Sequence, residues 1–475
     1  MKKSQLFNPY VLLLGFVWIA SCKVPSIVSK QESKATPVSY LDSKDTANAA
    51  NIQWRNYFKD PYLIALIDSA LVNNQELNVM KQEIEISKNE VMARKGEYLP
   101  FLRLGGGAAA VKAGRYTWDG ISEEDLKNNP DRGRKYIGEF MGGGIFSWEL
   151  DVWKKLRNAK KAAALRYLSS TEGRNFAVTN VVAEIVSSYY ELMALDNMLV
   201  IVNQNIELQK NVLQIVKQEK EAAKVTQLAV NRFEAQLLYT TNLQYEIKQS
   251  IVEAENKINF LVGRFPQRVQ RNSSSFDTQL QDPIFAGIPS QLLANRPDIR
   301  QAELELAASK LDVASARANF YPSFGLSAGL GFQAYNPLYI IKPASIFYNL
   351  GGELMAPLIN KNAIKATYFN ANAKQIQAVY QYEQSILNAH IEVVNQLSKI
   401  DNYRKSVETK SNEVSILTRS IDISNDLYRS ARADYMEVLL TQREALDSRI
   451  DLTEIKLKEL LAKISIYKAL GGGWK

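Results

Sequence analysis

Cys22, the one cysteine of this 475-residue chain, stands where covalent lipid chemistry is expected. It follows Ile19, Ala20 and Ser21, and an apolar residue, two small residues and a cysteine form the pattern of the bacterial lipobox. At a lipobox the chain is cut before the cysteine, and the thiol and the new amine are acylated. Several acyl chains at one residue anchor a protein stably, since each buried CH₂ contributes ~0.8 kcal/mol. We predict that Cys22 is lipidated.

The other residue types exclude most catalytic and metal chemistry. His390 is the one histidine, which removes histidine-based triads and multi-histidine metal sites, and no second cysteine can supply a thiolate ligand. The glycine runs 105–107, 142–144 and 471–473 lack the lysine and hydroxyl residue of a phosphate-binding loop. We therefore expect no enzyme activity, no cofactor and no metal ion.

The N-terminal residues predict export from the cytoplasm. Lys2 and Lys3 precede an apolar run from Val11 to Ala20, which is far shorter than the roughly 18 residues that span a bilayer. We interpret residues 1–21 as a lipoprotein signal peptide and 22–52 as a lipidated, flexible tether. The formal charge of +8 is dispersed among acidic residues and forms no basic block, so we expect no nucleic-acid partner.

Proline placement predicts two very long helical stretches. No proline lies between Pro130 and Pro266, and none follows Pro357. A helix from about Lys154 to Lys217 would be roughly 95 Å long, more than a globular core can use. Apolar residues recur at heptad spacing in both stretches, which favours coiled-coil-like packing into a tube or a rod. The two series are Val178, Val182, Ile185, Tyr189, Leu192 and Leu199, with Asp196 on the same seam, and Leu446, Ile450, Thr453, Leu457, Leu460, Ile464 and Tyr467.

Segments with a period of two lie between the helices and predict four strands in two hairpins, over 101–150 and 322–358. Aromatic and aliphatic residues alternate with glycine, serine and glutamate, the pattern of a transmembrane β-barrel, although an ordinary sandwich with a polar solvent face is the alternative. The side chains expected to face the inside of the barrel are Glu139, Ser147, Glu149, Asn349 and Glu353.

Four strands cannot close a barrel, and an open edge in hydrocarbon leaves backbone groups unpaired at several kcal/mol each. The chain must therefore oligomerise. Two chains would supply eight strands, and side chains fill the interior of an eight-stranded barrel. Three chains would supply twelve strands, which leave room for a pore. A conduit favours three.

An internal duplication organises the chain. Leu71, Asn73 and Pro100 stand 222 positions before Leu293, Asn295 and Pro322, so a helix that leads into "YLPFL" matches one that leads into "FYPSF". We predict a first repeat over 53–265 and a second over 290–475, each with a helix, a hairpin and two long helices. An inter-repeat linker and equatorial segment occupies 266–289. The fold class is a membrane α+β protein.

Six motifs, in order along the mature chain, resemble those of the TolC-like outer-membrane efflux factors, in particular their lipid-anchored branch. They are "SWELDVWKKLRNA" (147–159), "SSYYELMALD" (187–196), "INFLVGRFP" (258–266), "IPSQLLANRPDIRQAE" (288–303), "YMEVLLTQREAL" (435–446) and "ALGGGW" (469–474). The resemblance implies a homotrimer in the bacterial outer membrane, with a twelve-stranded barrel and a helical tunnel across the periplasm. It also implies an inner-membrane pump of the resistance-nodulation-division type and a periplasmic adaptor (membrane fusion) protein as partners.

The resemblance also implies a gate at the periplasmic end of the tunnel. By the motif "YMEVLL", Glu437 matches an acidic position near this gate, and Tyr428 matches a tyrosine that helps to hold it closed. Three such carboxylates in a ring would favour cations. Where the family often has a second aspartate, this chain has Leu440. Ala229 and Ala433 stand where some members have a charged pair across the gate, and Ala223 and Ala431 stand where the family usually has turn glycines. Closure would then depend on apolar contacts.

Three hypotheses of function follow. The first is a passive exit duct for drugs or metal ions, driven by an inner-membrane pump through the adaptor. The second is the outer-membrane duct of a type I protein secretion system. The third, of another class, is a lipid-anchored structural coiled-coil spacer.

Overall fold

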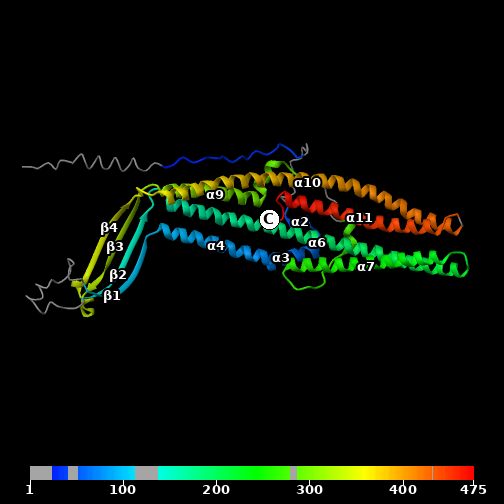
Figure 1. Cartoon of the computed structure of the whole chain (residues 1–475), viewed down its shortest axis with the longest axis horizontal. Coiled ribbons are helices and arrows are strands. Elements are labelled where there is room, and N and C mark those ends of the chain that lie inside the picture. The colour runs from blue at the N-terminus through cyan, green and yellow to red at the C-terminus, as the bar shows by residue number, and fades with distance from the viewer. Residues whose placement is uncertain (1–23, 41–51, 113–136, 279–285, 431, 475) are drawn as a thin grey trace, which may run out of the picture. The chain divides into compact units, whose positions relative to one another are not determined.

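Long helices form where proline is missing from the sequence. The computed structural model describes residues 24–40, 52–112, 137–278, 286–430 and 432–474. Helix α6 (Lys155–Glu221, 67 residues) confirms the long helix expected from about Lys154, and α10 (Asn362–Arg429, 68 residues) is its counterpart (Figure 1). Each is followed by a helix about half as long, α7 (Gln227–Val262) or α11 (Tyr435–Ala469). At 1.5 Å per residue, α6 and α10 are each about 100 Å long.

Shorter elements complete the chain. The shorter helices are α2 (Trp54–Tyr57), α3 (Pro61–Asn73), α4 (Gln75–Tyr98), α8 (Leu292–Asn295) and α9 (Pro297–Ala318). Turns of 3₁₀ helix lie at Ser273–Thr278, Pro289–Gln291, Pro337–Tyr339 and Pro343–Ser345. The strands are β1 (Phe101–Val111), β2 (Ile137–Leu150), β3 (Ser323–Ala334) and β4 (Ile346–Met355).

The two hairpins form one antiparallel sheet in the order β1-β2-β3-β4. Phe101 pairs with Ser147, Phe146 with Ala328 and Leu330 with Tyr348. The strand expected from Phe101 ends at Val111. The loop expected over 117–135, which joins the strands of the first hairpin, lies outside the described residues. Because β2 pairs with β3, the sheet joins segments from both halves of the sequence.

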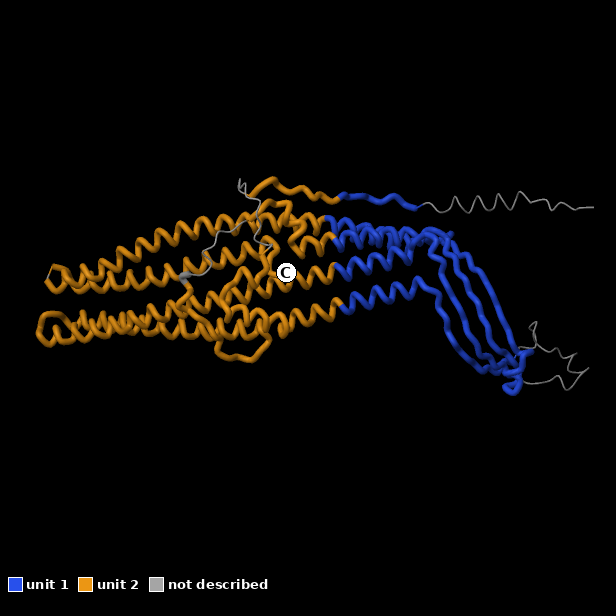
Figure 2. The backbone as a smooth tube through the Cα atoms, turned by 180° about the vertical axis from the view of Figure 1, so that it is seen from behind, with its two compact units in different colours: residues 1–31, 85–168, 304–379 blue, residues 32–84, 169–303, 380–475 orange. Residues whose placement is uncertain are grey.

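The chain divides into two units, each of which draws on both halves of the sequence (Figure 2). Unit 1 contains the sheet, within residues 85–168 and 304–379, together with the N-terminal residues up to 31. Unit 2 contains residues 32–84, 169–303 and 380–475.

The core of unit 2 forms around the first heptad series. Val182, Ile185, Tyr189 and Leu192 of α6 are fully or almost fully buried and pack with α2, α3, α7 and the end of α11. Residues of the second series, among them Ile464 and Tyr467, lie in the same cluster, so the heptad prediction is confirmed. Part of α6 is apolar enough to cross a membrane, but 56% of that window is buried, as expected of a core helix.

The described part of the expected tether, residues 24–40, contacts helices of both units. In unit 1, Val24 and Ile27 pack on a cluster around Phe320. In unit 2, Lys34 Nζ lies 2.6 Å from Glu303 Oε1, and the fully buried ring of Tyr40 stacks on the imidazole of His390 at 5.3 Å. His390 thus has a packing role.

Candidate functional site

The turn between α6 and α7 reverses the chain with an alanine in a conformation that favours glycine. Ala223 has φ +56°, and the amides of Ala223 and Lys224 donate to the carbonyls of Lys220 and Glu219 at 3.0 and 2.9 Å. This pair of hydrogen bonds is a Schellman motif, which usually has glycine at the left-handed position. The Thr226 side chain then caps α7 by accepting from the amide of Ala229.

Tyr428, predicted at the gate, joins the two helix pairs of unit 2. Its hydroxyl donates to Glu219 Oε2 at 2.6 Å, so the last turn of α10 is tied to the last turn of α6. Burial, and then the Glu219 carboxylate, raise the pKa of Tyr428 far above its usual range. The phenol is therefore a permanent donor. Sequence inspection did not identify Glu219, because nothing in the local sequence connects positions 209 residues apart.

Glu437 and Leu440 share an exposed face of α11, one turn apart, and the hydrogen bond of Tyr428 goes to Glu219 and not to Glu437. Glu437 lies in the first turn of α11, where the helix dipole favours a negative charge. Behind this face lies an apolar cluster from three helices, which includes the buried Ala229 that replaces a charged residue of the resemblance. Its buried members are Leu213, Val216, Ala229, Val230 and Phe233, and Tyr435 and Leu439 pack against them.

The sheet places all five residues expected inside a barrel on one face. The register pairs odd-numbered residues with odd-numbered ones throughout, so Glu149, Gly325 and Glu353 form one cross-strand row and Ser147, Ser327 and Gly351 the next. The opposite face is apolar and largely exposed in the single chain. It includes Leu102, Leu104, Leu326, Leu330, Phe332, Ile346, Tyr348, Leu350 and Leu354.

Two glycines let β2 and β3 approach closely on the polar face. A Cβ on Gly143 would lie 2.5 Å from the Leu330 carbonyl oxygen, and one on Gly331 would collide with the backbone of Gly142 and Gly143. On the apolar face, Cβ atoms built at Gly142 and Gly144 meet nothing closer than 3.4 Å. The backbones of β2 and β3 therefore approach each other closely on the polar side at this pair of glycines.

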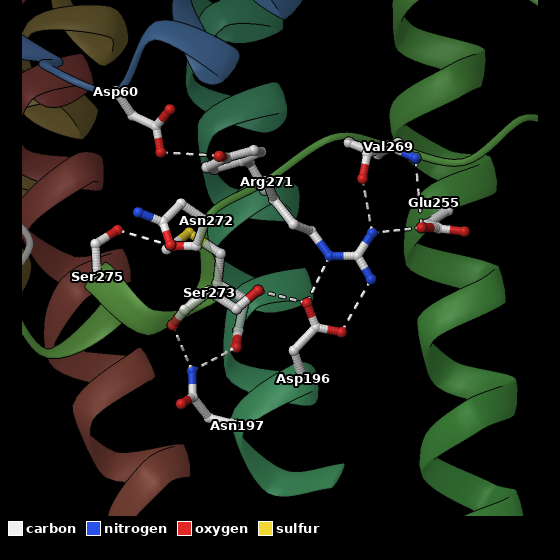
Figure 3. A network of polar contacts seen from close by, with 11 residues as sticks. Asp60, Asp196, Asn197, Glu255, Val269, Arg271, Asn272, Ser273 and Ser275 are labelled. Carbon is white, nitrogen blue, oxygen red and sulfur yellow. Dashed lines mark hydrogen bonds and ion pairs between the residues drawn. The ribbon is translucent and has the colours of Figure 1, made fainter. Parts of the chain in front are cut away.

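A polar network that the sequence did not predict fixes the loop after α7 to the middle of unit 2 (Figure 3). The Arg271 guanidinium donates to both carboxylate oxygens of Asp196, at 2.6 and 2.9 Å, and also to Glu255 and to the Val269 carbonyl. Ser273 donates to Asp196 as well. Burial raises the pKa of Asp196, but the hydrogen bonds from Arg271 and Ser273 outweigh it and hold that pKa below its usual range.

A second buried arginine explains the motifs "IPSQLLANRPDIRQAE" and "ALGGGW". Arg296 donates to both carboxylate oxygens of Asp298, to Glu392 of α10 at 2.7 Å and to the Ala469 carbonyl of α11 at 2.8 Å. Gly471, at φ +91°, approaches the Asn295 carbonyl so closely that a Cβ would lie 2.6 Å from its oxygen. The C-terminal glycines are therefore packing residues of unit 2. Cys22 lies outside the described residues.

Comparison with known proteins connects these features to one family. The family model described as outer membrane efflux protein matches residues 66–264 and 288–472. The pyoverdine export outer membrane protein OpmQ of Pseudomonas aeruginosa is 28% identical over 424 residues, 89% of this chain and 88% of its own. The cation efflux system protein CusC of Escherichia coli O6:H1 is 26% identical over 428 residues, 90% of each chain. The probable outer membrane lipoprotein SilC of Salmonella typhimurium is 24% identical over 453 residues, 95% of this chain and 93% of its own.

Solved structures show the same fold. A membrane protein from Pseudomonas aeruginosa superposes with a TM-score of 0.85 at 22% identity, over 93% of this chain and 99% of its own. A CusC structure does so with a TM-score of 0.82 at 23% identity, over 94% and 99%.

Proposed function

Since the chain belongs to the outer membrane efflux protein family, we propose that it is the outer-membrane channel of a tripartite efflux system, a trimeric exit duct for small molecules. The observation that carries this proposal is a four-stranded sheet with one exposed apolar face and one polar face, continuous in sequence with helices of about 100 Å. Its relatives are named for pyoverdine export and for cation efflux.

The open edges of the sheet support a trimer. Within the described residues, β1 and β4 each pair on one side only. Hydrocarbon cannot satisfy their free backbone groups, so the edge of β4 must pair with β1 of another copy. Three copies give twelve strands, enough to leave a water-filled interior lined by the polar face that carries Glu139, Ser147, Glu149, Asn349 and Glu353.

The two halves support an origin by duplication. In each half a hairpin is followed by a helix of 67 or 68 residues and then by one of 36 or 35 residues. We assign 53–265 and 290–475 to the two repeats, joined by 266–289. Cys22 is the lipidation site that anchors the chain to the membrane at the start of the 22–52 tether. Mass spectrometry of the mature N-terminal peptide tests it: an acylated cysteine is expected, and an unmodified thiol contradicts the assignment.

The channel itself is passive and takes its energy from an inner-membrane pump, reached through a periplasmic adaptor. Deletion of the gene is expected to raise sensitivity to some drugs or metal ions, and the purified protein is expected to be a trimer that conducts ions in planar bilayers. A protein that remains monomeric in several mild detergents and gives no conductance would contradict the proposal, and would favour a structural spacer. Restored resistance by the wild-type gene is the control.

The helix ends of unit 2 form the gate. The hydrogen bond between Tyr428 and Glu219 joins the two helix pairs, the apolar cluster around Phe233 packs them, and Glu437 and Leu440 lie on the exposed face. Tyr428→Phe removes the bond alone, and we expect the opening equilibrium to shift by about 1 kcal/mol, roughly fivefold, toward the open state. Single-channel open probability measures it.

Tyr435→Phe is the matched control for this variant. The ring of Tyr435 packs on Phe233 at 6.5 Å, and its hydroxyl makes no hydrogen bond within the described residues. The open probability of Tyr435→Phe should equal that of the wild type. Equal open probabilities for Tyr428→Phe and the wild type would remove Tyr428 from the gate.

A further inference from the structure

The polar face of the sheet carries one arginine among three glutamates. Arg103 on β1 pairs with Ile145 on β2, Ile145 pairs with Gly329 on β3, and Gly329 pairs with Asn349 on β4, so these four residues form one cross-strand row. The carboxylates lie in other rows, Glu149 and Glu353 toward the start of β3 and Glu139 toward its end. The charges of this face are therefore arranged in separate levels along the strands.

Glycine and serine occupy the middle positions of both rows next to Arg103. The row on one side consists of Phe101, Ser147, Ser327 and Gly351, and the row on the other side of Gly105, Gly143, Gly331 and Phe347. The Arg103 side chain is exposed. Within one chain, no carboxylate stands in its own row or in either neighbouring row, so a solute can reach the guanidinium along the polar face.

No carboxylate of the described residues neutralises Arg103. Its guanidinium makes no ion pair there, and its carbon lies 5.0 Å from the centre of the Phe101 ring. Glu149 is paired with Lys155, and Glu139 accepts a hydrogen bond from Gln333 at 2.6 Å. Glu149 lies four residues beyond Ile145 on β2, a path of about 13 Å. This exceeds the screening length of ~8 Å at physiological ionic strength.

We infer that Arg103 is an anion-recognition point inside the barrel, which binds carboxylate groups of small molecules that pass through it. The inference rests on the proposed channel function and adds a substrate class to it. A guanidinium is always charged, and its fork of N–H donors matches the two oxygens of a carboxylate. The Phe101 ring covers one face of the group, which orients it and removes part of its hydration. In a trimer, three such groups would stand at one level of the pore.

Ion selectivity tests the inference on the full-length trimer in planar bilayers. Reversal potentials are measured under a KCl gradient for the wild type, Arg103→Gln and Arg103→Lys. In Arg103→Gln we expect the ratio of chloride to potassium permeability to fall at least about twofold, since the glutamates of the same face then act alone. Arg103→Lys keeps the charge and should stay near the wild-type ratio. Citrate added on one side should reduce the wild-type current and leave that of Arg103→Gln unchanged.

Two controls separate the possible failures. Arg55→Gln removes the same charge from α2, where Arg55 is paired with Asp68, and should leave the permeability ratio unchanged. A wild-type protein without conductance would contradict the channel itself. A conducting Arg103→Gln trimer with wild-type selectivity and wild-type block by citrate would overturn this inference alone.

Discussion

At the scale of single residues, Ala223 is one of three non-glycine residues with a positive φ in the described part of the chain. It holds φ +56° in the turn that closes α6 onto α7. A Cβ in this conformation costs about 1–2 kcal/mol, whereas glycine adopts it freely and loses up to ~1 kcal/mol through the entropy of the unfolded chain. We therefore expect Ala223→Gly to stabilise the protein by up to about 1 kcal/mol.

The midpoint of thermal unfolding measures this change, with Ala222→Gly as the control. Ala222 precedes Ala223 in the same turn and has no positive φ. Its replacement by glycine should lower the midpoint, because glycine brings only the entropic loss there. A lower midpoint for both variants would show that the left-handed backbone conformation of Ala223 carries no strain.

Asp196 predicts how stability depends on pH. Its pKa in the folded protein lies below the ordinary value of 3.8, because Arg271 and Ser273 donate to its carboxylate and outweigh burial. The stabilisation is therefore complete above about pH 4 and is lost as the pH falls through the lower folded pKa. At neutral pH, Asp196→Asn should destabilise the protein by about 2 kcal/mol. Thermal unfolding from pH 7 to pH 3 measures it, and the difference between variant and wild type should shrink below pH 4.

Asp401→Asn is the comparison for a surface pair. Asp401 pairs with Lys405 and Arg404 on the exposed side of α10, where solvent screens the charges. Its replacement should change the midpoint little at any pH. A pH-independent difference between Asp196→Asn and the wild type would contradict the assigned role of the carboxylate.

At the scale of elements, one pair of glycines, Gly143 and Gly331, lets β2 and β3 approach closely on the polar face. Gly105 and Gly143 are direct partners on the same face, yet a Cβ on Gly143 would lie 2.5 Å from a carbonyl oxygen of β3, whereas one on Gly105 meets nothing within 4 Å. We expect Gly143→Ala to force β2 and β3 apart and to cost about 1–3 kcal/mol. Gly105→Ala should stay within about 0.5 kcal/mol of the wild type.

The fraction of trimer that survives heating in detergent distinguishes the two alanine variants. Gly143→Ala should lose it at a lower temperature than Gly105→Ala. Identical loss in both would mean that the close approach of β2 and β3 is relaxed without effect on the barrel.

At the scale of the whole molecule, the proposed trimer predicts contact between β1 of one copy and β4 of the next. Leu104 and Leu350 lie on these edge strands, are 85% and 83% exposed and share the apolar face. A chain with both residues replaced by cysteine should form dimers and trimers on denaturing gels after treatment with a short bismaleimide, because neighbouring strands lie about 4.8 Å apart.

Two controls accompany the cross-linking. Wild-type protein should give none, since lipidation occupies the thiol of Cys22. Cysteines at Phe146 and Ala328, which are partners within one chain, should react without a change in apparent mass. Purely monomeric product from the Leu104 and Leu350 variant would exclude pairing of these edges.

Much of the fold follows from local pattern. The absence of proline permits α6 and α10, because a proline inside a helix removes a backbone hydrogen bond. Period-two alternation locates the strands and assigns Glu139 and Glu353 to one face, because successive side chains point to opposite sides. These rules need only neighbours along the chain, and so the sequence alone was sufficient.

Partners that lie far apart in the sequence required the tertiary structure. The contact of Tyr428 with Glu219 spans 209 positions, and the ion pair of Arg271 with Asp196 spans 75. The heptad pattern placed Asp196 on a seam but could not name the arginine that satisfies it. Spacing along the chain records which face of an element is apolar, and only the packing of α6, α7, α10 and α11 decides which polar side chains meet.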